Sequence, residues 1–244
     1  MKAYRRDIES LCRSSLHGRG TGPRMHAIAV LLLLLVAMSP ASAAPNSVSA
    51  ASTAHVYLLR GVLNIFSLGL DDIAAQLRAQ GIPVTVANFA SWSSLADEAA
   101  LAYKSGRIKT IILVGHSSGA TALPDMVAKL DQLGAPVTLA IGLDSVFRTK
   151  LSGRVGRYVN FYIANGNGEP VARTAQLQGK LENINVQSVP GVGHMSIDKN
   201  QIMQRRVISE IDAVVFGRSV QKSRQHGAAD AVRAGTANTA AVRQ

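Results

Sequence analysis

The segment from Lys109 to Gly119, KTIILVGHSSG, constrains the fold of this chain more than any other. Its first part is apolar and rich in β-branched residues, which predicts a buried strand over 109–114. A G-x-S-x-G turn centred on Ser117 follows, and a helical pattern then covers 118–133. Gly115 and Gly119 let neighbouring backbone pass closely, because they carry no Cβ atom that could clash. We therefore predict a strand that passes through a tight, strained turn directly into a helix.

Strand and helix patterns alternate along the middle of the chain, an order that favours a parallel sheet. Most of the strand candidates are nearly continuous apolar runs, as expected of strands that are covered on both faces. The strand candidates are 55–60, 84–89, 109–114, 137–143, 158–164 and 184–189, and the helical patterns are 69–80, 94–105, 118–133 and 198–215. The predicted fold class is α/β, with a mostly parallel central sheet of about six strands flanked by helices.

The N-terminal region has the features of an export signal. Residues 27–38, AIAVLLLLLVAM, form an apolar run that is too short to span a bilayer, and a basic stretch precedes it. Ala41-Ser42-Ala43 supplies the small residues of a cleavage site. We expect residues 1–43 to be a signal peptide with a basic leader, and the mature protein to be periplasmic or secreted, without a membrane span. An uncleaved anchor is the alternative, and Met25 is a second candidate for the start of translation.

The formal net charge of +11 is concentrated at the two ends of the chain. Residues 1–43 and 217–244 each carry +4, whereas residues 44–216, the predicted catalytic domain, carry +3. A nucleic-acid-binding protein concentrates basic charge on its folded surface, so we expect no nucleic-acid partner. The segment 217–244 has almost no large apolar residues and is predicted to be a basic disordered tail. The only cysteine, Cys12, lies in the leader, so we expect neither a disulfide nor a thiolate metal site in the mature chain.

The turn at Ser117 is the arrangement that presents a nucleophilic serine at the end of a strand. A serine hydroxyl needs a base to take its proton, and histidine is the usual one. His55 stands at the beginning of the first strand, at the opposite end of the sheet from the serine. His116 is next to the serine and is expected to point away, and His226 lies in the tail. His194 lies in a glycine-rich loop after the last predicted strand, at the sheet edge where Ser117 is expected. His194 is therefore the candidate base.

Two carboxylates compete for the role of the acid that orients this histidine. Asp144 ends the strand candidate 137–143 and falls between the serine and the histidine in chain order. Glu169 follows the next strand candidate, in the segment Asn165-Gly-Asn-Gly-Glu, and competes for this role. We favour Asp144 and keep Glu169 as the alternative acid. Asp198 is close to His194 in sequence, but it opens the last helical pattern and is interpreted as an N-cap.

An acyl-transfer site also needs two backbone N–H groups that bind the oxyanion. Ser118 follows the nucleophile and begins a helix, whose positive dipole end adds stabilisation. The second donor is expected from the loop after the first strand, Arg60-Gly61-Val62-Leu63, with the Val62 N–H as the candidate. An ordinary strand-to-helix loop is the alternative interpretation of that segment.

The GHSSG turn, the order Ser117, Asp144, His194 and the Arg60-Gly61 loop together resemble the α/β-hydrolase superfamily over about residues 55–215. The segment Gly142-Leu-Asp-Ser is similar to the pancreatic-type lipases, which carry their acid after the sixth strand of the fold. Many members have His-Gly where this chain has Arg60-Gly61. The domain also begins at what corresponds to the superfamily's third strand, as in cutinases and the small bacterial lipases. The resemblance implies a lipase-, esterase- or thioesterase-like serine hydrolase with a small-molecule acyl substrate and no metal or organic cofactor.

The substrate itself is only weakly indicated by the sequence. Leu63, Ile65, Phe66 and Leu68 follow the first strand and form either an acyl pocket or the buried face of the next helix. Trp92 either walls the pocket or is a structural residue. The expected function is hydrolysis of an acyl ester or thioester through an acyl-enzyme. The alternatives are acyl transfer or peptide cleavage at the same site, and a binding protein that keeps the fold without turnover.

Overall fold

The computed structural model describes residues 50–164, 166 and 168–217. All of these residues belong to one compact unit of the chain, Ala44–Gln244. The signal peptide predicted over 1–43 and residues 218–244 of the tail predicted over 217–244 lie outside the described residues. No helix among the described residues is long and apolar enough to cross a membrane.

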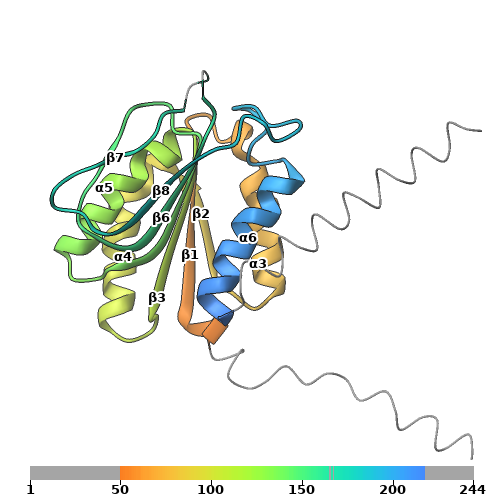
Figure 1. Cartoon of the computed structure of the whole chain (residues 1–244). Helices are drawn as coiled ribbons and strands as arrows, with labels where there is room; N and C mark the ends of the chain where they lie inside the picture. The colour runs from red at the N-terminus through yellow and green to blue at the C-terminus, as the bar shows by residue number, and fades with distance from the viewer. Residues whose placement is uncertain (1–49, 165, 167, 218–244) are drawn as a thin grey trace, which may run out of the picture. The chain divides into compact units, whose positions relative to one another are not determined.

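A central sheet of parallel strands forms the middle layer of the described unit (Figure 1). Its strand order is β2-β1-β3-β4-β6-β8, and every neighbouring pair runs parallel. The strands are β1 (Ala54–Arg60), β2 (Val84–Asn88), β3 (Thr110–His116), β4 (Val137–Leu143), β6 (Arg154–Tyr162) and β8 (Gln178–Asn185). This sheet, with helices on both faces, confirms the α/β fold class predicted from the alternation of strand and helix patterns.

Helices cover the two faces of the sheet in pairs, as Figure 1 shows. The helices α3 and α6 pack together on one face, and α4 and α5 pack together on the other. Their bounds are α3 (Gly69–Ala79), α4 (Trp92–Lys104), α5 (Ser118–Gln132) and α6 (Gln201–Phe216). Two short 3-10 helices, η1 (Ile65–Ser67) and η2 (Phe89–Ser91), follow β1 and β2.

Alternation along the central strands creates two hydrophobic cores. On β1, Val56 and Leu58 join the core beneath α3 and α6, whereas Tyr57 and Leu59 join the core beneath α4 and α5. Successive residues of β3 divide between the two cores in the same way. Because both faces of these strands are buried, nearly every position must be apolar, which produces the continuous runs in the sequence.

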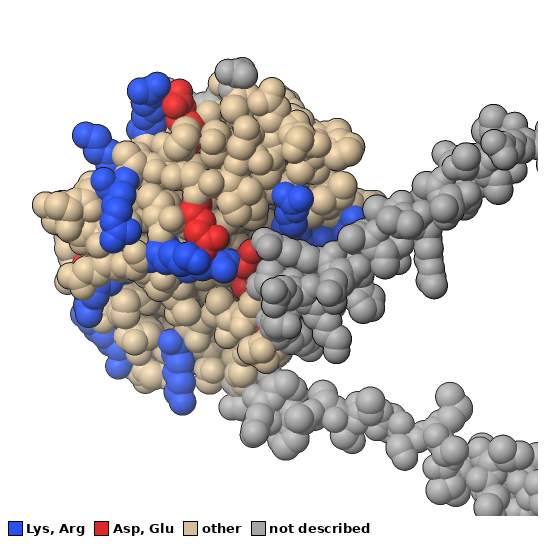
Figure 2. Space-filling model, in the orientation of Figure 1, with Lys and Arg blue, Asp and Glu red and all other residues tan. Residues whose placement is uncertain are grey.

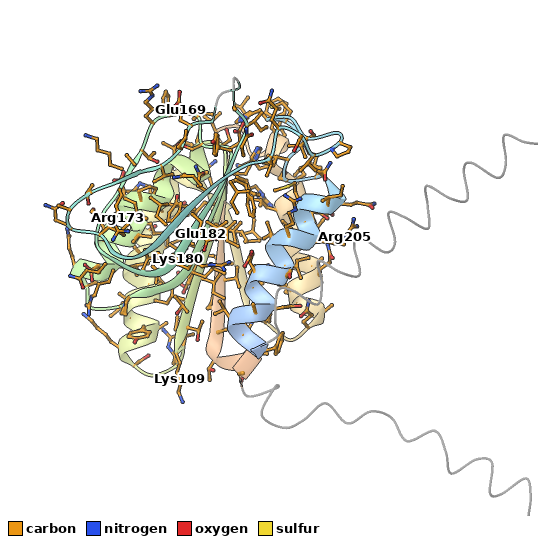
Figure 3. The ribbon with its side chains drawn as sticks, in the orientation of Figure 1. Lys109, Glu169, Arg173, Lys180, Glu182 and Arg205 are labelled. Atoms are coloured by element: carbon orange, nitrogen blue, oxygen red, sulfur yellow. The ribbon has the colours of Figure 1, made fainter. Side chains whose placement is uncertain are left out.

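The last strand lies earlier in the chain than its predicted position. We expected a strand over 184–189, but β8 spans Gln178–Asn185 and is mostly polar. It is an edge strand with β6 as its one neighbour in the sheet, so it does not need an apolar sequence. Lys180 and Glu182 form an ion pair on this strand and are labelled in Figure 3. The apolar residues that suggested the strand, Val186 and Val189, are buried in the loop that follows it.

Two further strands were not predicted from the sequence. The strands β5 (Lys150–Leu151) and β7 (Ala172–Arg173) pair in parallel as a separate two-stranded sheet. Each is two residues long, too short to produce a periodic pattern in the sequence.

On the face shown in Figure 2, Lys and Arg side chains are scattered among uncharged residues, with Asp or Glu beside several of them.

The strand order changes direction between β1 and β3, because β2 follows on one side of β1 and β3 lies on the other. In open α/β sheets, ligands bind outside the carboxyl ends of the strands at such a switch point. The segment after β1 begins with Gly61, the residue after β3 is Ser117, and the residue after the neighbouring β4 is Asp144. The topology therefore brings three of the segments singled out by the sequence to one edge of the sheet.

Candidate functional site

Ser117 occupies a strained turn between β3 and α5, as the sequence predicts. Its backbone has φ 58° and ψ −121°, a left-handed conformation that non-glycine residues rarely adopt. The two flanking glycines make this turn possible. A Cβ at Gly119 would lie 2.0 Å from the Leu59 carbonyl oxygen, and a Cβ at Gly115 would lie 2.5 Å from the Gly119 backbone. The glycines of the motif are thus required by close backbone packing around the serine.

Ser117, His194 and Asp144 form a continuous chain of hydrogen bonds. The Ser117 Oγ lies 3.0 Å from the His194 Nε2, and the His194 Nδ1 lies 2.7 Å from the Asp144 Oδ2. A carboxylate only accepts hydrogen bonds, so the Nδ1 atom of His194 carries the proton. The Nε2 atom then has a free lone pair that accepts a hydrogen bond from the Ser117 hydroxyl. This is the tautomer that a general base acting on Ser117 requires.

Asp144 is held rigidly at the end of β4. Its carboxylate is fully buried, and its backbone has a positive φ of 49°. The Oδ1 atom accepts a hydrogen bond of 3.0 Å from the Ile163 N–H, which leaves the Oδ2 atom to bind His194. Gly168 is buried against the same carboxylate, since a Cβ at that position would lie 1.9 Å from the Oδ1 atom. The loop after β6 therefore covers Asp144.

Glu169, the alternative acid, lies elsewhere in that loop. Its carboxylate forms an ion pair of 3.3 Å with Arg148, and both side chains are substantially exposed. Figure 3 shows Glu169 at the outer end of the molecule, on the loop beyond the sheet edge. The His194 ring has its hydrogen bond with Asp144, and no hydrogen bond among the described residues joins it to Glu169. The structure thus brings Asp144, and not Glu169, together with Ser117 and His194.

The two proposed oxyanion donors belong to segments that adjoin the serine. Ser118 is the first residue of α5, where a backbone N–H has no partner within its own helix. The loop after β1 packs directly on the serine, since a Cβ at Gly61 would lie 3.1 Å from the Ser117 Cβ. The Gly61 N–H donates to the Ser67 Oγ at 2.9 Å, and no hydrogen bond among the described residues uses the Val62 N–H. Val62 thus remains the candidate donor from this loop.

An apolar rim surrounds this edge of the sheet. We give that name to the exposed residues Val62, Leu63, Ile65, Phe66, Leu68, Phe147 and Met195. Five of them lie in the segment that follows β1. Phe147 lies in the segment after Asp144, and Met195 is next to His194. The sequence left open whether the residues of segment 63–68 form a pocket or the buried face of a helix. Their exposure shows that the second interpretation is wrong: α3 begins at Gly69, and within η1 only Ser67 is buried. Trp92 is partly buried against the core beneath α4 and α5.

Two buried polar residues behind the serine were not recognised from the sequence as parts of this site. His116 points away from the serine as expected, but its ring binds Ser67 on one side and the His194 backbone on the other. Asp198 does not cap the last helix, because α6 begins at Gln201 and Asn200 caps it. The Asp198 Oδ2 instead accepts a hydrogen bond of 2.9 Å from the N–H of Gly69, the first residue of α3. Contacts between distant segments have no local sequence signal, which is why the pattern suggested an N-cap.

Burial shifts the protonation of both residues. Desolvation lowers the pKa of His116 below 6.5, and the opposing influences are Asp198, Asp144 and its hydrogen bond to the His194 carbonyl. Desolvation also raises the pKa of Asp198 above 3.8, against the attraction of His116 and Lys199. As pH falls below 6.5, the unfolded chain gains a proton on this histidine before the folded protein does. His116 therefore makes folding more favourable as pH rises toward 6.5. Asp198 has the opposite effect on stability. As pH rises above 3.8, the unfolded chain loses the proton of this carboxyl before the folded protein does, so Asp198 makes folding less favourable.

Within the described part of the chain, no group of three or more His, Cys, Asp or Glu residues could hold a metal ion. Comparison of the sequence with protein-family models and with curated proteins gave no match. The assignment of a function therefore depends on the arrangement of the site itself.

Proposed function

We propose that this protein is a serine hydrolase that cleaves an acyl ester or thioester. The observation that carries the proposal is the hydrogen-bonded chain from Ser117 through His194 to the buried Asp144. A serine in a strained turn, a histidine in the required tautomer and an orienting carboxylate are the three parts that nucleophilic acyl transfer needs. A structural role alone gives no reason for the positive φ of 58° at Ser117, which costs conformational energy.

The geometry supports the following sequence of steps. The Ser117 Oγ attacks the carbonyl carbon of the acyl group, and its proton passes to the His194 Nε2. The Asp144 carboxylate stabilises the imidazolium that forms. The carbonyl oxygen becomes an oxyanion, which the N–H groups of Val62 and Ser118 bind. Each such donor contributes about 3 kcal/mol to lowering the barrier.

The first half of the reaction ends when His194 donates its proton to the leaving alcohol or thiol, which departs and leaves an acyl ester on Ser117. The second half repeats the same roles with water as the nucleophile. A water molecule then gives a proton to His194 and attacks the acyl carbon. The bond between the acyl carbon and the Ser117 Oγ then breaks, His194 returns its proton to that Oγ, and the carboxylic acid is released. The cycle uses side chains and backbone groups of this chain together with water.

The apolar rim supports an acyl substrate over a charged one. Five of its seven residues are aliphatic or sulfur-containing, Phe66 and Phe147 are aromatic, and all seven are exposed. Apolar side chains at the edge of a site favour an apolar group, at about 25 cal/mol for each Å² removed from water. We also propose that the chain is a minimal member of the α/β-hydrolase superfamily and that it is exported.

Hydrolysis of p-nitrophenyl esters by the purified mature chain tests this proposal. The wild type should hydrolyse the esters, and Ser117→Ala and His194→Ala should each lose about 10⁴-fold or more in kcat. His55→Ala serves as the control, because His55 lies at the start of β1, bonded to Thr85, and should keep wild-type activity. A folded wild type without activity on esters or thioesters would support the binding-protein alternative. Activity only with an amide or an acyl acceptor other than water would favour peptide cleavage or acyl transfer.

A further inference from the structure

His116 is the residue immediately before Ser117, and its side chain is almost completely buried. Its ring lies behind the proposed site, with its centroid 5.3 Å from that of the His194 ring. The two rings are tilted by 38° and are joined by no direct hydrogen bond between ring nitrogens in the described structure. A buried imidazole needs partners for both nitrogens, and here the partners come from two different loops.

The first partner is the loop that holds the proposed base. The His116 Nε2 lies 2.8 Å from the backbone carbonyl oxygen of His194. A carbonyl oxygen only accepts, so the proton of the neutral ring is on Nε2 and the Nδ1 atom has a lone pair. This bond holds the backbone of His194, whose ring nitrogen Nε2 lies 3.0 Å from the Ser117 Oγ.

The second partner is the loop that holds the proposed oxyanion donor. The His116 Nδ1 lies 2.8 Å from the Ser67 Oγ, and in the neutral ring it accepts the proton of that hydroxyl. The Ser67 Oγ in turn accepts the Gly61 N–H at 2.9 Å. The orientation of the Gly61 peptide is thereby fixed, and the next donor along the loop is the unused Val62 N–H.

Two other contacts join the same pair of loops. Asp198 binds the N–H of Gly69, and its other oxygen, Oδ1, lies 4.0 Å from the His116 Nδ1. The Lys199 Nζ donates to the carbonyl oxygens of Phe66 and Met195, at 3.0 Å each. These contacts attach the loops at their outer parts. Of the three side chains, His116 is the one whose hydrogen bonds lead to Gly61 and to His194 itself.

The ring fits this network only when it is neutral. One donor at Nε2 and one acceptor at Nδ1 match the carbonyl and the hydroxyl that face them. Desolvation lowers the pKa of His116, which keeps the ring neutral at neutral pH. Three titratable residues influence the pKa of this ring electrostatically: Asp198, His194 and Asp144.

We propose that His116 is a positioning residue that holds the backbone of His194 and, through Ser67, the Gly61–Val62 peptide in place around Ser117. The proposal rests on the serine hydrolase function proposed above. A loss of this ring should therefore lower the rate of the chemical step more than it lowers substrate affinity. A displacement of about 1 Å in a reacting group costs about 10²-fold in rate, which sets the size of the expected effect.

Three variants separate the two branches of the network. His116→Phe removes both hydrogen bonds while keeping a ring. Ser67→Ala removes only the branch to Gly61. His116→Gln places a side-chain N–H near the position of Nε2 and can restore the bond to the His194 carbonyl. The control is Leu130→Ala, a fully buried residue in the second half of α5 that creates a cavity away from the loops.

The experiment measures kcat and KM of ester hydrolysis at a temperature where every variant is folded. His116→Phe should lower kcat about 10²-fold with KM changed by less than about threefold. His116→Gln should recover at least about tenfold of that loss, and Ser67→Ala should lose about tenfold. The double variant of Ser67→Ala and His116→Phe should be no slower than His116→Phe alone, because both changes cut the same network. Leu130→Ala should lower the melting temperature and leave kcat unchanged.

The split between kcat and KM, together with the recovery in His116→Gln, distinguishes positioning from mere stability. Amide hydrogen exchange of Gly61 reports on the network without a substrate and should speed up in both His116→Phe and Ser67→Ala.

The outcomes of failure are distinct for the two proposals. An active wild type whose His116→Phe variant keeps its kcat would overturn the positioning role. A His116→Phe variant whose loss of activity is fully explained by its fraction of unfolded protein would overturn it as well. If His116→Phe does not fold, His116→Gln and Ser67→Ala decide the question by the same criteria. A wild type with slow Gly61 exchange but no hydrolase activity would instead refute the proposed function.

Discussion

Gly168 should not tolerate even a methyl group, because it packs directly on the proposed acid. A Cβ at this position would lie 1.9 Å from the Asp144 Oδ1 and 2.8 Å from its Cγ. Real Cβ atoms are essentially never found within 3.0 Å of another heavy atom. The carboxylate is fully buried and is bonded through Oδ1 to the Ile163 N–H, so the clash cannot be relieved toward solvent.

The structure gives the size of the effect of Gly168→Ala. The contact must lengthen from 1.9 Å to at least 3.0 Å, so the loop or the carboxylate must move by about 1 Å. A shift of that size in a group of the site costs about 10²-fold in rate. Complete loss of the orienting role of the acid costs about 10⁴-fold, which is the upper bound. We therefore expect kcat to fall between about 10²- and 10⁴-fold.

Steady-state hydrolysis of a soluble ester measures this effect, with a thermal melt to establish that the variant is folded. Gly193→Ala is the matched control: it lies next to His194, and its Cβ would come no closer than 3.6 Å to its nearest neighbour, the Ser196 Oγ. It should keep most of the activity. A folded Gly168→Ala variant with the kcat of the wild type would show that the position of the Asp144 carboxylate does not matter for the reaction.

Three further predictions concern the acid, the buried histidine and the rim. Asp144→Asn should lower kcat by about 10⁴-fold while Glu169→Gln changes it little; the reverse result would transfer the role of acid to Glu169. The free energy of unfolding in urea should fall from pH 6.5 to pH 5.5 more steeply in the wild type than in His116→Phe, by at most about 1.4 kcal/mol per pH unit. Equal slopes would show that the buried ring does not resist protonation. Leu63→Ser should reduce kcat/KM for an octanoyl ester several-fold more than for an acetyl ester, at about 0.8 kcal/mol for each methylene that loses its contact. An equal loss on both esters would exclude contact between Leu63 and the acyl chain.

The central strands of the fold could be predicted because they are buried on both faces. In β1, β3 and β4, this burial imposes apolar runs that the sequence displays directly. The position of strand β8 was predicted wrongly, because an edge strand pairs on one side only and tolerates polar residues such as Lys180 and Glu182. The helices agreed with the sequence patterns within about three residues at each end, the range in which helix boundaries are least determined.

The sequence could predict which loops form the candidate site, because the topology of the sheet determines where these loops lie. Parallel strands end at a common edge, so the loops bearing Ser117, Asp144 and His194 had to lie near one another. Which carboxylate faces the histidine depends on the path of the loop after β6, and the sequence left Glu169 as an alternative. The network around His116 could not be anticipated, because its hydrogen bonds join segments 49 and 78 residues apart in the chain.

The measurement that tests the central claim most directly is labelling of the purified mature protein with a fluorophosphonate, followed by mass spectrometry of its peptides. Such reagents phosphonylate a serine whose hydroxyl is activated by a neighbouring base. We predict one adduct, on Ser117, that forms rapidly in the wild type, is absent in Ser117→Ala and is greatly slowed in His194→Ala. A folded wild type that remains unlabelled, or an adduct at another serine that persists in Ser117→Ala, would contradict the claim that Ser117 is an activated nucleophile.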